Sequence, residues 1–122
     1  MFDNIKAMGA LAGLMKNKDK LKEAGERVKA KMDATRVIGE AGGGAARVIA
    51  TGAMRIIEVE LTHGLVVGMA ADEKTRALAG ALIAEATNQA LTRAQLVMKE
   101  TVDEEAKAMG LDGIPGLDKL FG

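Results

Sequence analysis

The feature that most constrains this fold is a long apolar repeat near the end of the chain, where an apolar residue recurs at every fourth position. Residues spaced this way lie close together on one side of a helix. Asp72 is a predicted N-cap, and the pattern continues to about Met109. The predicted helix is therefore about 57 Å long at 1.5 Å per residue. Its apolar positions are Leu78, Leu82, Ala86, Ala90, Ala94, Met98, Val102 and Ala106.

Three short strands are predicted before this helix, at residues 34–41, 45–51 and 54–62, because their apolar residues follow a shorter period and glycines separate them. Residues 63–71, HGLVVGMAA, are predicted to form a loop or a short turn. A strand of seven residues spans only about 23 Å. A three-stranded sheet therefore cannot cover the long helix. The remaining length is expected to contact another helix, a second protomer or water, and the alanine positions suit a homodimer seam as well as packing within one chain.

A first amphipathic helix is predicted from Leu14 to Met32, with an apolar side and cationic borders. The apolar side carries Leu14, Leu21, Val28 and Met32, and the acids fall opposite it. One border contains Lys16, Lys20, Arg27 and Lys31, and the other contains Lys18, Lys22 and Lys29. Such lysines can merely solvate the helix, with their stems along the apolar side. They can also bind the phosphate backbone of DNA, which requires cations but no base-reading residues.

The glycine-rich run from Gly39 to Gly52 is predicted to be a hairpin, not a phosphate-binding loop. A Walker loop needs Lys followed by Ser or Thr after its glycines, whereas here Ala45, Ala46 and Arg47 follow. A dinucleotide-binding loop joins a strand to a helix, and this run joins two predicted strands. The glycines are expected to supply positive φ angles in a turn.

Few residues could support catalysis or bind a cofactor. The sequence has no Ser, Cys or Tyr, so the usual nucleophiles are missing. His63 is its one histidine, and Asp103, Glu104 and Glu105 are interpreted as a solvated helix end. We therefore expect no enzyme activity, no cofactor and no metal site.

Composition limits the other function classes. At 122 residues the chain fits one domain, 1–122, in which residues 1–13 are predicted to be a mobile extension and 110–122 an irregular tail. Two Phe and no Trp or Tyr disfavour single-strand binding by base stacking. The net charge is zero, yet residues 1–36 carry nine basic residues against five acidic ones. The absence of Cys suits the cytoplasm, and the N-terminus has no apolar run long enough for a signal peptide or a membrane span.

Several motifs occur in an order that resembles the YbaB/EbfC family of bacterial nucleoid-associated proteins. They are LMK in a Met- and Lys-rich first helix, G-E-A-G-G-G-x-x-x-V, a T-G turn, an I-x-V-x-L strand and A-x-N-Q-A in a long helix. The resemblance covers essentially the whole chain, and the Gly39–Gly52 hairpin and the Asn88 neighbourhood are its most specific parts. Family members commonly have Asp-Pro after the third strand, where this chain has Thr62-His63.

The resemblance implies an α+β fold. The expected protomer is α-β-β-β-α, with a three-stranded antiparallel sheet and two long helices, and it dimerises through its sheet into a tweezer-like shape. The implied function is non-enzymatic binding of duplex DNA, with coating or compaction of the nucleoid in the cytoplasm. The residues expected to contact DNA are Lys16, Lys18, Lys20, Lys22, Arg27, Lys29 and Lys31.

Two other functions are compatible with the residues. The chain could be a protein-interaction module, such as an adaptor for DNA replication or repair factors, in which DNA contact is incidental. A weaker alternative places Ile5, Met8, Ala12 and Met15 on a membrane surface. We expect no membrane partner.

Overall fold

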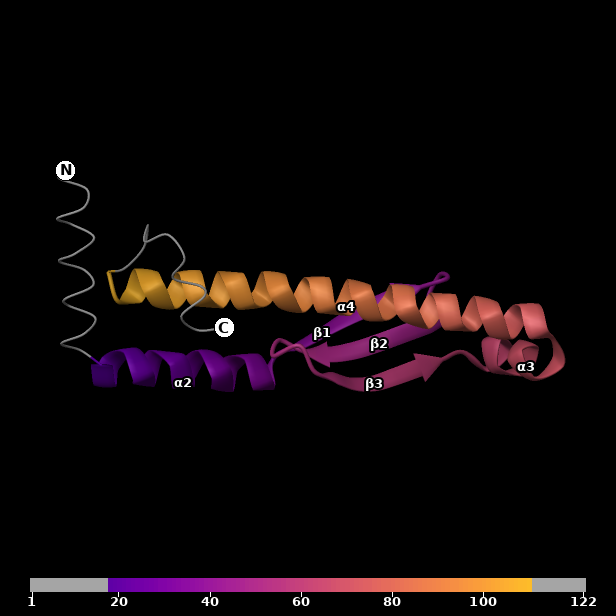
Figure 1. The fold of residues 1–122 in the computed structure, drawn as a ribbon, viewed down its shortest axis with the longest axis horizontal. Helices are drawn as coiled ribbons and strands as arrows, with labels where there is room; N and C mark the ends of the chain where they lie inside the picture. Colours follow the sequence, from indigo (N-terminus) through magenta and orange to yellow (C-terminus); the bar gives the residue numbers. More distant parts are fainter. Residues whose placement is uncertain (1–17, 111–122) are drawn as a thin grey trace, which may run out of the picture. The chain divides into compact units, whose positions relative to one another are not determined.

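The computed structural model describes residues 18–110, and its elements carry the labels of Figure 1. They are α2 (Lys18–Ala34), β1 (Arg36–Ala41), β2 (Ala46–Thr51), β3 (Ile56–Leu61), α3 (His63–Ala71) and α4 (Glu73–Ala108). This order confirms the predicted α+β class with three antiparallel strands between helices. The predicted extension, residues 1–13, lies outside the described residues, as does the predicted tail except Gly110.

The described residues divide into two compact units. The first, called the helical unit here, contains residues 18–31 of α2 and residues 99–110 at the end of α4. The second, called the sheet unit, contains residues 32–98 and therefore all three strands, α3 and most of α4. Each unit has its own buried residues.

The sheet is a meander in the order β1-β2-β3 with both pairs antiparallel. Its first hairpin pairs Ala41 with Ala46, and the turn between them contains three glycines with φ angles of 64°, 66° and 93° at Gly42, Gly43 and Gly44. This confirms the predicted hairpin, because a side chain at such φ angles would strain the backbone. A bulge interrupts the pairing of β2 with β3 at Ile49 and Ala50.

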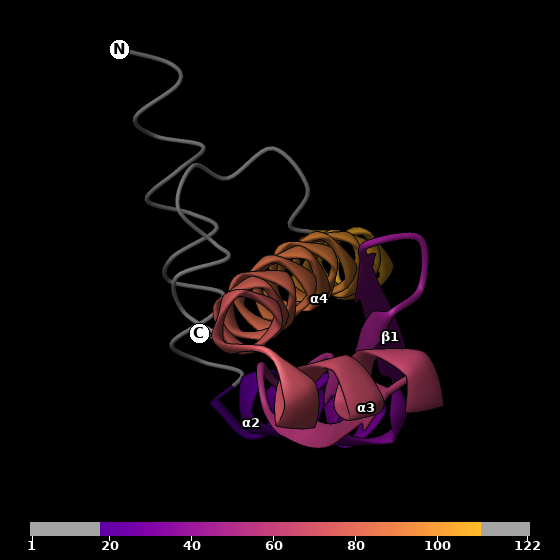
Figure 2. The same cartoon turned by 90° about the vertical axis from the view of Figure 1, so that its right-hand side faces the viewer.

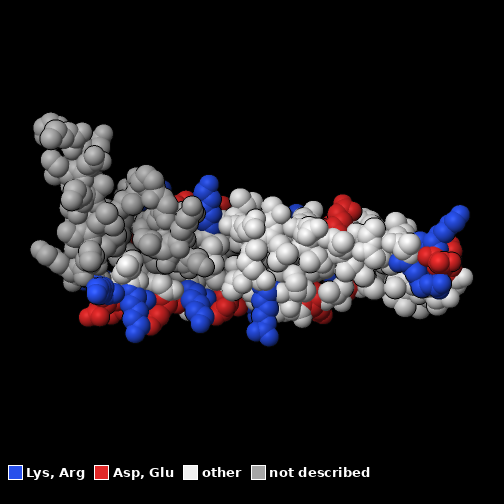
Figure 3. Space-filling view, viewed as in Figure 1, with Lys and Arg blue, Asp and Glu red and all other residues white. Residues whose placement is uncertain are grey.

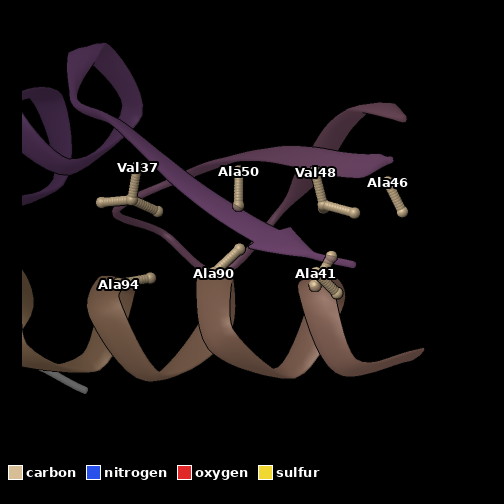
Figure 4. Packing of buried hydrophobic residues seen from close by; sticks show 8 residues of the cluster. Val37, Ala41, Ala46, Val48, Ala50, Ala90 and Ala94 are labelled. Carbon is tan, nitrogen blue, oxygen red and sulfur yellow. The ribbon is translucent and has the colours of Figure 1, made fainter. Parts of the chain in front are cut away.

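The core of the sheet unit forms where α4 packs against β1 and β2. Ala86, Ala90 and Ala94 of α4 are fully buried. Small residues on both sides let the helix approach the sheet closely, as Figure 4 shows for Ala90 and Ala94. The strands contribute Val37, Ala41, Ala46, Val48 and Ala50.

Gly39 of β1 marks the closest approach between the sheet and α4. A Cβ atom at this position would lie 2.0 Å from the carbonyl oxygen of Ala86 and 2.6 Å from the backbone nitrogen of Ala90. Neither is a side-chain atom that could rotate away. Glycine is therefore required here by the separation of two backbones and not by its own φ angle.

Residues 63–71, predicted to be a loop or a short turn, form a helix instead, and that prediction is wrong. Thr62 caps α3, with its side-chain oxygen accepting a hydrogen bond from the backbone N–H of Leu65 at 3.4 Å. The helix has no polar face and buries only Leu65, so the periodic signal that identifies a helix in a sequence is missing. Figure 2 shows α3 beside the start of α4.

Asp72 separates α3 from α4. Its backbone N–H donates to the carbonyl of Gly68 at the end of α3. Its carboxylate accepts hydrogen bonds from the backbone N–H of Lys74 at 3.0 Å and from the hydroxyl of Thr75 at 3.3 Å. The predicted N-cap is therefore confirmed.

The predicted apolar positions of the long helix are correct except at its start. Leu78 is 54% exposed, and Ala79 is buried instead. An α-helix has 3.6 residues per turn, so every fourth residue drifts by about 40°. Leu78 is three such steps from Ala90, so it lies about 120° around the helix from the buried side. Ala79 is eleven residues from Ala90 and lies only about 20° from that side. In the helical unit the buried residues of α4 are Thr101, Val102 and Ala106.

Candidate nucleic-acid interface

Helix α2 carries six of the seven cations expected to contact DNA, and Lys16 lies outside the described residues. Ala24 and Val28 are buried on the apolar side of the helix, in agreement with the predicted amphipathic pattern. Its cations are all exposed. Figure 3 shows blue cationic and red acidic side chains alternating along α2. The six are Lys18, Lys20, Lys22, Arg27, Lys29 and Lys31.

Two of these cations form ion pairs with acids near the end of α4. One carboxylate oxygen of Glu105 accepts from Nε of Arg27 at 2.7 Å and lies 2.6 Å from its Nη2. The ammonium group of Lys31 donates to Oε2 of Glu104 at 3.1 Å. The side chain of Glu105 is only 22% exposed, against 69% for Glu104. The Arg27 pair is therefore the better shielded of the two.

The remaining lysines of α2 differ from Arg27 and Lys31. Within residues 18–110, no carboxylate oxygen lies within 4.0 Å of the ammonium groups of Lys18, Lys20, Lys22 or Lys29. These side chains are exposed. Their charges are thus available to an external anion without first breaking an ion pair in the described part of the chain.

The interpretation of Asp103, Glu104 and Glu105 as a solvated helix end fits Asp103 and Glu104, which are exposed, but it is wrong for Glu105, whose side chain is only 22% exposed. Glu104 and Glu105 pair with α2, which is 73 and 78 residues away in the sequence. Their own neighbours in the sequence give no sign of this pairing. Only the tertiary arrangement brings the acids to one cationic border of α2.

A second surface of interest lies on β3 and α3, where apolar side chains are exposed. The five residues of this β3–α3 surface are between 37% and 52% exposed. The five belong to two consecutive elements of the chain, and exposed apolar patches mark interaction sites on soluble proteins. They are Ile56, Ile57, Val59, Val66 and Val67.

The two edges of the sheet have different surroundings within the sheet unit. At β1, Oε1 of Gln89 accepts from the backbone N–H of Glu40, and Arg93 donates to the carbonyl of Ile38. Two side chains of α4 thus occupy this edge. Within the described residues no strand pairs with the outer edge of β3. An unpaired edge is a template for another strand.

The outer face of the sheet carries a short charge ladder. Nε of Arg47 on β2 lies 3.8 Å from Glu40 on β1 and 3.7 Å from Glu60 on β3. These three residues are cross-strand partners in the register. Because Arg47 is flanked by two acids, we do not count it among the candidate DNA contacts.

The described residues contain no cluster of three or more His, Cys, Asp or Glu side chains that could hold a metal ion. His63 lies exposed at the start of α3. No helix in residues 18–110 combines the length and the apolar character that crossing a membrane requires.

Comparison with known proteins identifies the family. The model of the YbaB/EbfC DNA-binding family matches residues 8–109, which is most of the chain. This chain belongs to the YbaB/EbfC DNA-binding family. The family match spans α2, the whole sheet unit and α4, and the family is a DNA-binding one.

One similar solved structure is that of the uncharacterized protein HP0035 from Helicobacter pylori. The two chains share 16% sequence identity, and the comparison covers 86% of this chain and 99% of the other. The TM-score is 0.45. Membership of the YbaB/EbfC family rests on the family match and not on this likeness.

Proposed function

We propose that this chain is a non-enzymatic protein of the bacterial nucleoid that binds duplex DNA mainly through the phosphate backbone and coats or compacts it. The observation that carries the proposal is the set of exposed lysines on α2 in a member of a DNA-binding family. Phosphate contacts need point charges on a surface and no base-reading side chains. The scarcity of aromatic residues favours a duplex over stacked single strands.

The proposed binding form is a homodimer. The β3–α3 surface exposes apolar side chains beside the unpaired edge of β3, and the β1 edge is already occupied by Gln89 and Arg93. A second copy that used the same surface would cover both the apolar side chains and the strand edge, as a two-fold symmetric interface does. A dimer also doubles the number of α2 cations on one assembly, which matters for a chain with zero net charge.

The test is the affinity for duplex DNA over a series of salt concentrations, with two unrelated sequences. If each protomer of a dimer neutralises two to four phosphates, the slope of log K against log salt will be about −4 to −7. Similar affinities and slopes for both sequences are the expected result. A strong preference for one sequence would contradict binding through the backbone.

The same experiment separates the proposed function from the protein-interaction alternative. An adaptor for replication or repair factors would bind its partner through apolar contacts that persist at high salt. The β3–α3 surface is compatible with such a partner. Absence of duplex binding even at low salt would refute our proposal and favour the adaptor.

A further inference from the structure

The two cationic borders of α2 have the same spacing but different surroundings. Lys20, Arg27 and Lys31 follow each other at intervals of seven and four residues, and on the other border Lys18, Lys22 and Lys29 follow at intervals of four and seven. Both spacings bring residues back to the same side of a helix. By spacing alone these two sets of three cations are equivalent as candidate DNA contacts, and the first border also contains Lys16, which lies outside the described residues.

The structure removes this equivalence, because only one border faces acids of α4. Glu105 and Glu104 neutralise Arg27 and Lys31 at 2.6 Å and 3.1 Å. A DNA phosphate that approached this border would have to displace a carboxylate and would then lie close to it. Since two cations and two anions sum to zero, the part of this border formed by Arg27 and Lys31 gains little from the release of counterions that drives DNA binding.

The opposite border keeps its charge. Lys22 and Lys29 each have an acid four residues further along, Glu26 and Asp33, yet neither forms an ion pair within the described residues. A lysine that precedes its acid by four residues is also the less favourable order for a helical pair. Lys18 and Lys22 are themselves four residues apart, and like charges at this spacing repel each other.

We infer that the two borders of α2 have different roles. On one, called the brace border, Arg27 and Lys31 hold α2 against the end of α4 through their ion pairs. On the other, called the phosphate border, Lys18, Lys22 and Lys29 bind the phosphates of the duplex. The three lysines are spaced by about 6 Å and about 10 Å along the helix axis at 1.5 Å per residue, so each can reach a separate phosphate. Lys20 belongs to the brace border by its helical position, and the acid-paired residues of that border are Arg27 and Lys31. This inference rests on the proposed function.

The first experiment is a pair of variants that act on one border each. In the phosphate-border variant, Lys18, Lys22 and Lys29 are all changed to Gln. In the brace-swap variant, Arg27→Glu and Lys31→Glu are combined with Glu105→Arg and Glu104→Lys, which keeps the net charge and both opposite-charge pairs. The control for lost charge is Lys74→Gln, an exposed lysine of the sheet unit.

The expected results differ in the salt slope. The phosphate-border variant loses about 0.9 in the magnitude of the slope for every phosphate contact removed, with affinity lowered at least tenfold at low salt. The brace-swap variant keeps the wild-type slope and affinity within about twofold. Arg27→Glu alone, which places two acids together, is expected to lower the melting temperature, and adding Glu105→Arg is expected to restore it.

A second measurement uses the unaltered protein. Acetylation of lysines by an amine-reactive ester, followed by mass spectrometry, reports which ammonium groups the duplex covers. We expect added DNA to slow the acetylation of Lys18, Lys22 and Lys29, and to leave the rates of Lys31 and Lys74 unchanged. Protection of Lys31 together with no protection of Lys22 and Lys29 would overturn the assignment.

The two proposals fail in different ways. If the wild-type protein shows no salt-dependent binding to duplex DNA, the proposed function is wrong. If the wild type binds but the brace swap abolishes binding while the phosphate-border variant keeps it, DNA binding stands and the division of the borders is wrong.

Discussion

The side chain of Gln89 accepts a hydrogen bond from the backbone N–H of Glu40 at 2.7 Å, so that α4 protects the edge of β1 as well as its face. Four residues along the helix, Arg93 donates to the carbonyl of Ile38 on the same edge. The helix that supplies the buried alanines therefore also caps one side of the sheet. Among the described strands, the outer edge of β3 remains open to pairing with another strand, and this is the edge that we propose for the dimer.

Replacing Gln89 by Ala is expected to lower the free energy of unfolding by about 0.5–1 kcal/mol. The backbone N–H of Glu40 would lose its partner, and because the site is exposed, water can replace part of the hydrogen bond. Urea denaturation followed by circular dichroism measures the change. Gln95→Ala, at an exposed position of the same helix, is the control and is expected to have no measurable effect.

Replacing Gly39 by Ala is expected to be more harmful, at about 2–3 kcal/mol. The new methyl group would overlap backbone atoms of Ala86 and Ala90, and overpacking that rotamer changes cannot relieve forces the elements apart. Gly80→Ala is the matched control, because a Cβ there meets nothing within 4 Å. That change removes a glycine from an exposed helix and is expected to stabilise the protein by about 0.5–1 kcal/mol. Thermal denaturation of both variants shows whether the first change lowers the melting temperature and the second raises it.

The sequence predicted the parts of the fold in which apolar residues or glycines leave a local pattern along the chain. The four-residue repeat in α4 and the glycines at positive φ both leave local signals, and both predictions are confirmed. The helix α3 leaves none, because its exposed and buried positions are equally apolar. Its two glycines also make it resemble a loop.

For the candidate site, the sequence predicted which helix carries the cations, but not which of its two borders forms ion pairs with other residues. Helical spacing places Arg27 and Lys31 on one border and Lys22 and Lys29 on the other, but it cannot say which border meets the acids of α4. That depends on how α2 and the end of α4 pair in the helical unit. The membership of the family indicates DNA binding without selecting residues.

Replacing Asp72 by Ala is expected to lower the free energy of unfolding by about 1 kcal/mol, the usual cost of losing an N-cap. Its carboxylate holds the backbone N–H of Lys74 and the hydroxyl of Thr75. Asp72→Asn keeps a side-chain acceptor and is expected to retain most of the stability. Chemical denaturation of both variants measures the difference. Equal losses in the two would show that the negative charge, and not the hydrogen bond, is what α4 requires.

The proposed dimer predicts different outcomes at two neighbouring residues of β3. Val59 is 46% exposed and belongs to the β3–α3 surface. Val59→Arg is expected to weaken dimerisation about a hundredfold or more, because an unpaired charge would be buried in the interface. Glu58→Arg is the matched control: Glu58 is also exposed, and adjacent residues of a strand point to opposite faces. Sedimentation velocity over a range of protein concentrations gives the dissociation constants.

Unfolding of the Val59→Arg monomer would confuse this result, so its circular dichroism spectrum and melting curve are recorded alongside. The fold is expected to persist, because the side chain is already half exposed in the single chain and the core of the sheet unit lies between α4 and the strands β1 and β2. A folded Val59→Arg variant that dimerises as tightly as the wild type would exclude this surface from the interface. If Glu58→Arg alone disrupts the dimer, the second copy instead packs on the outer face of the sheet, where Arg47 lies between Glu40 and Glu60.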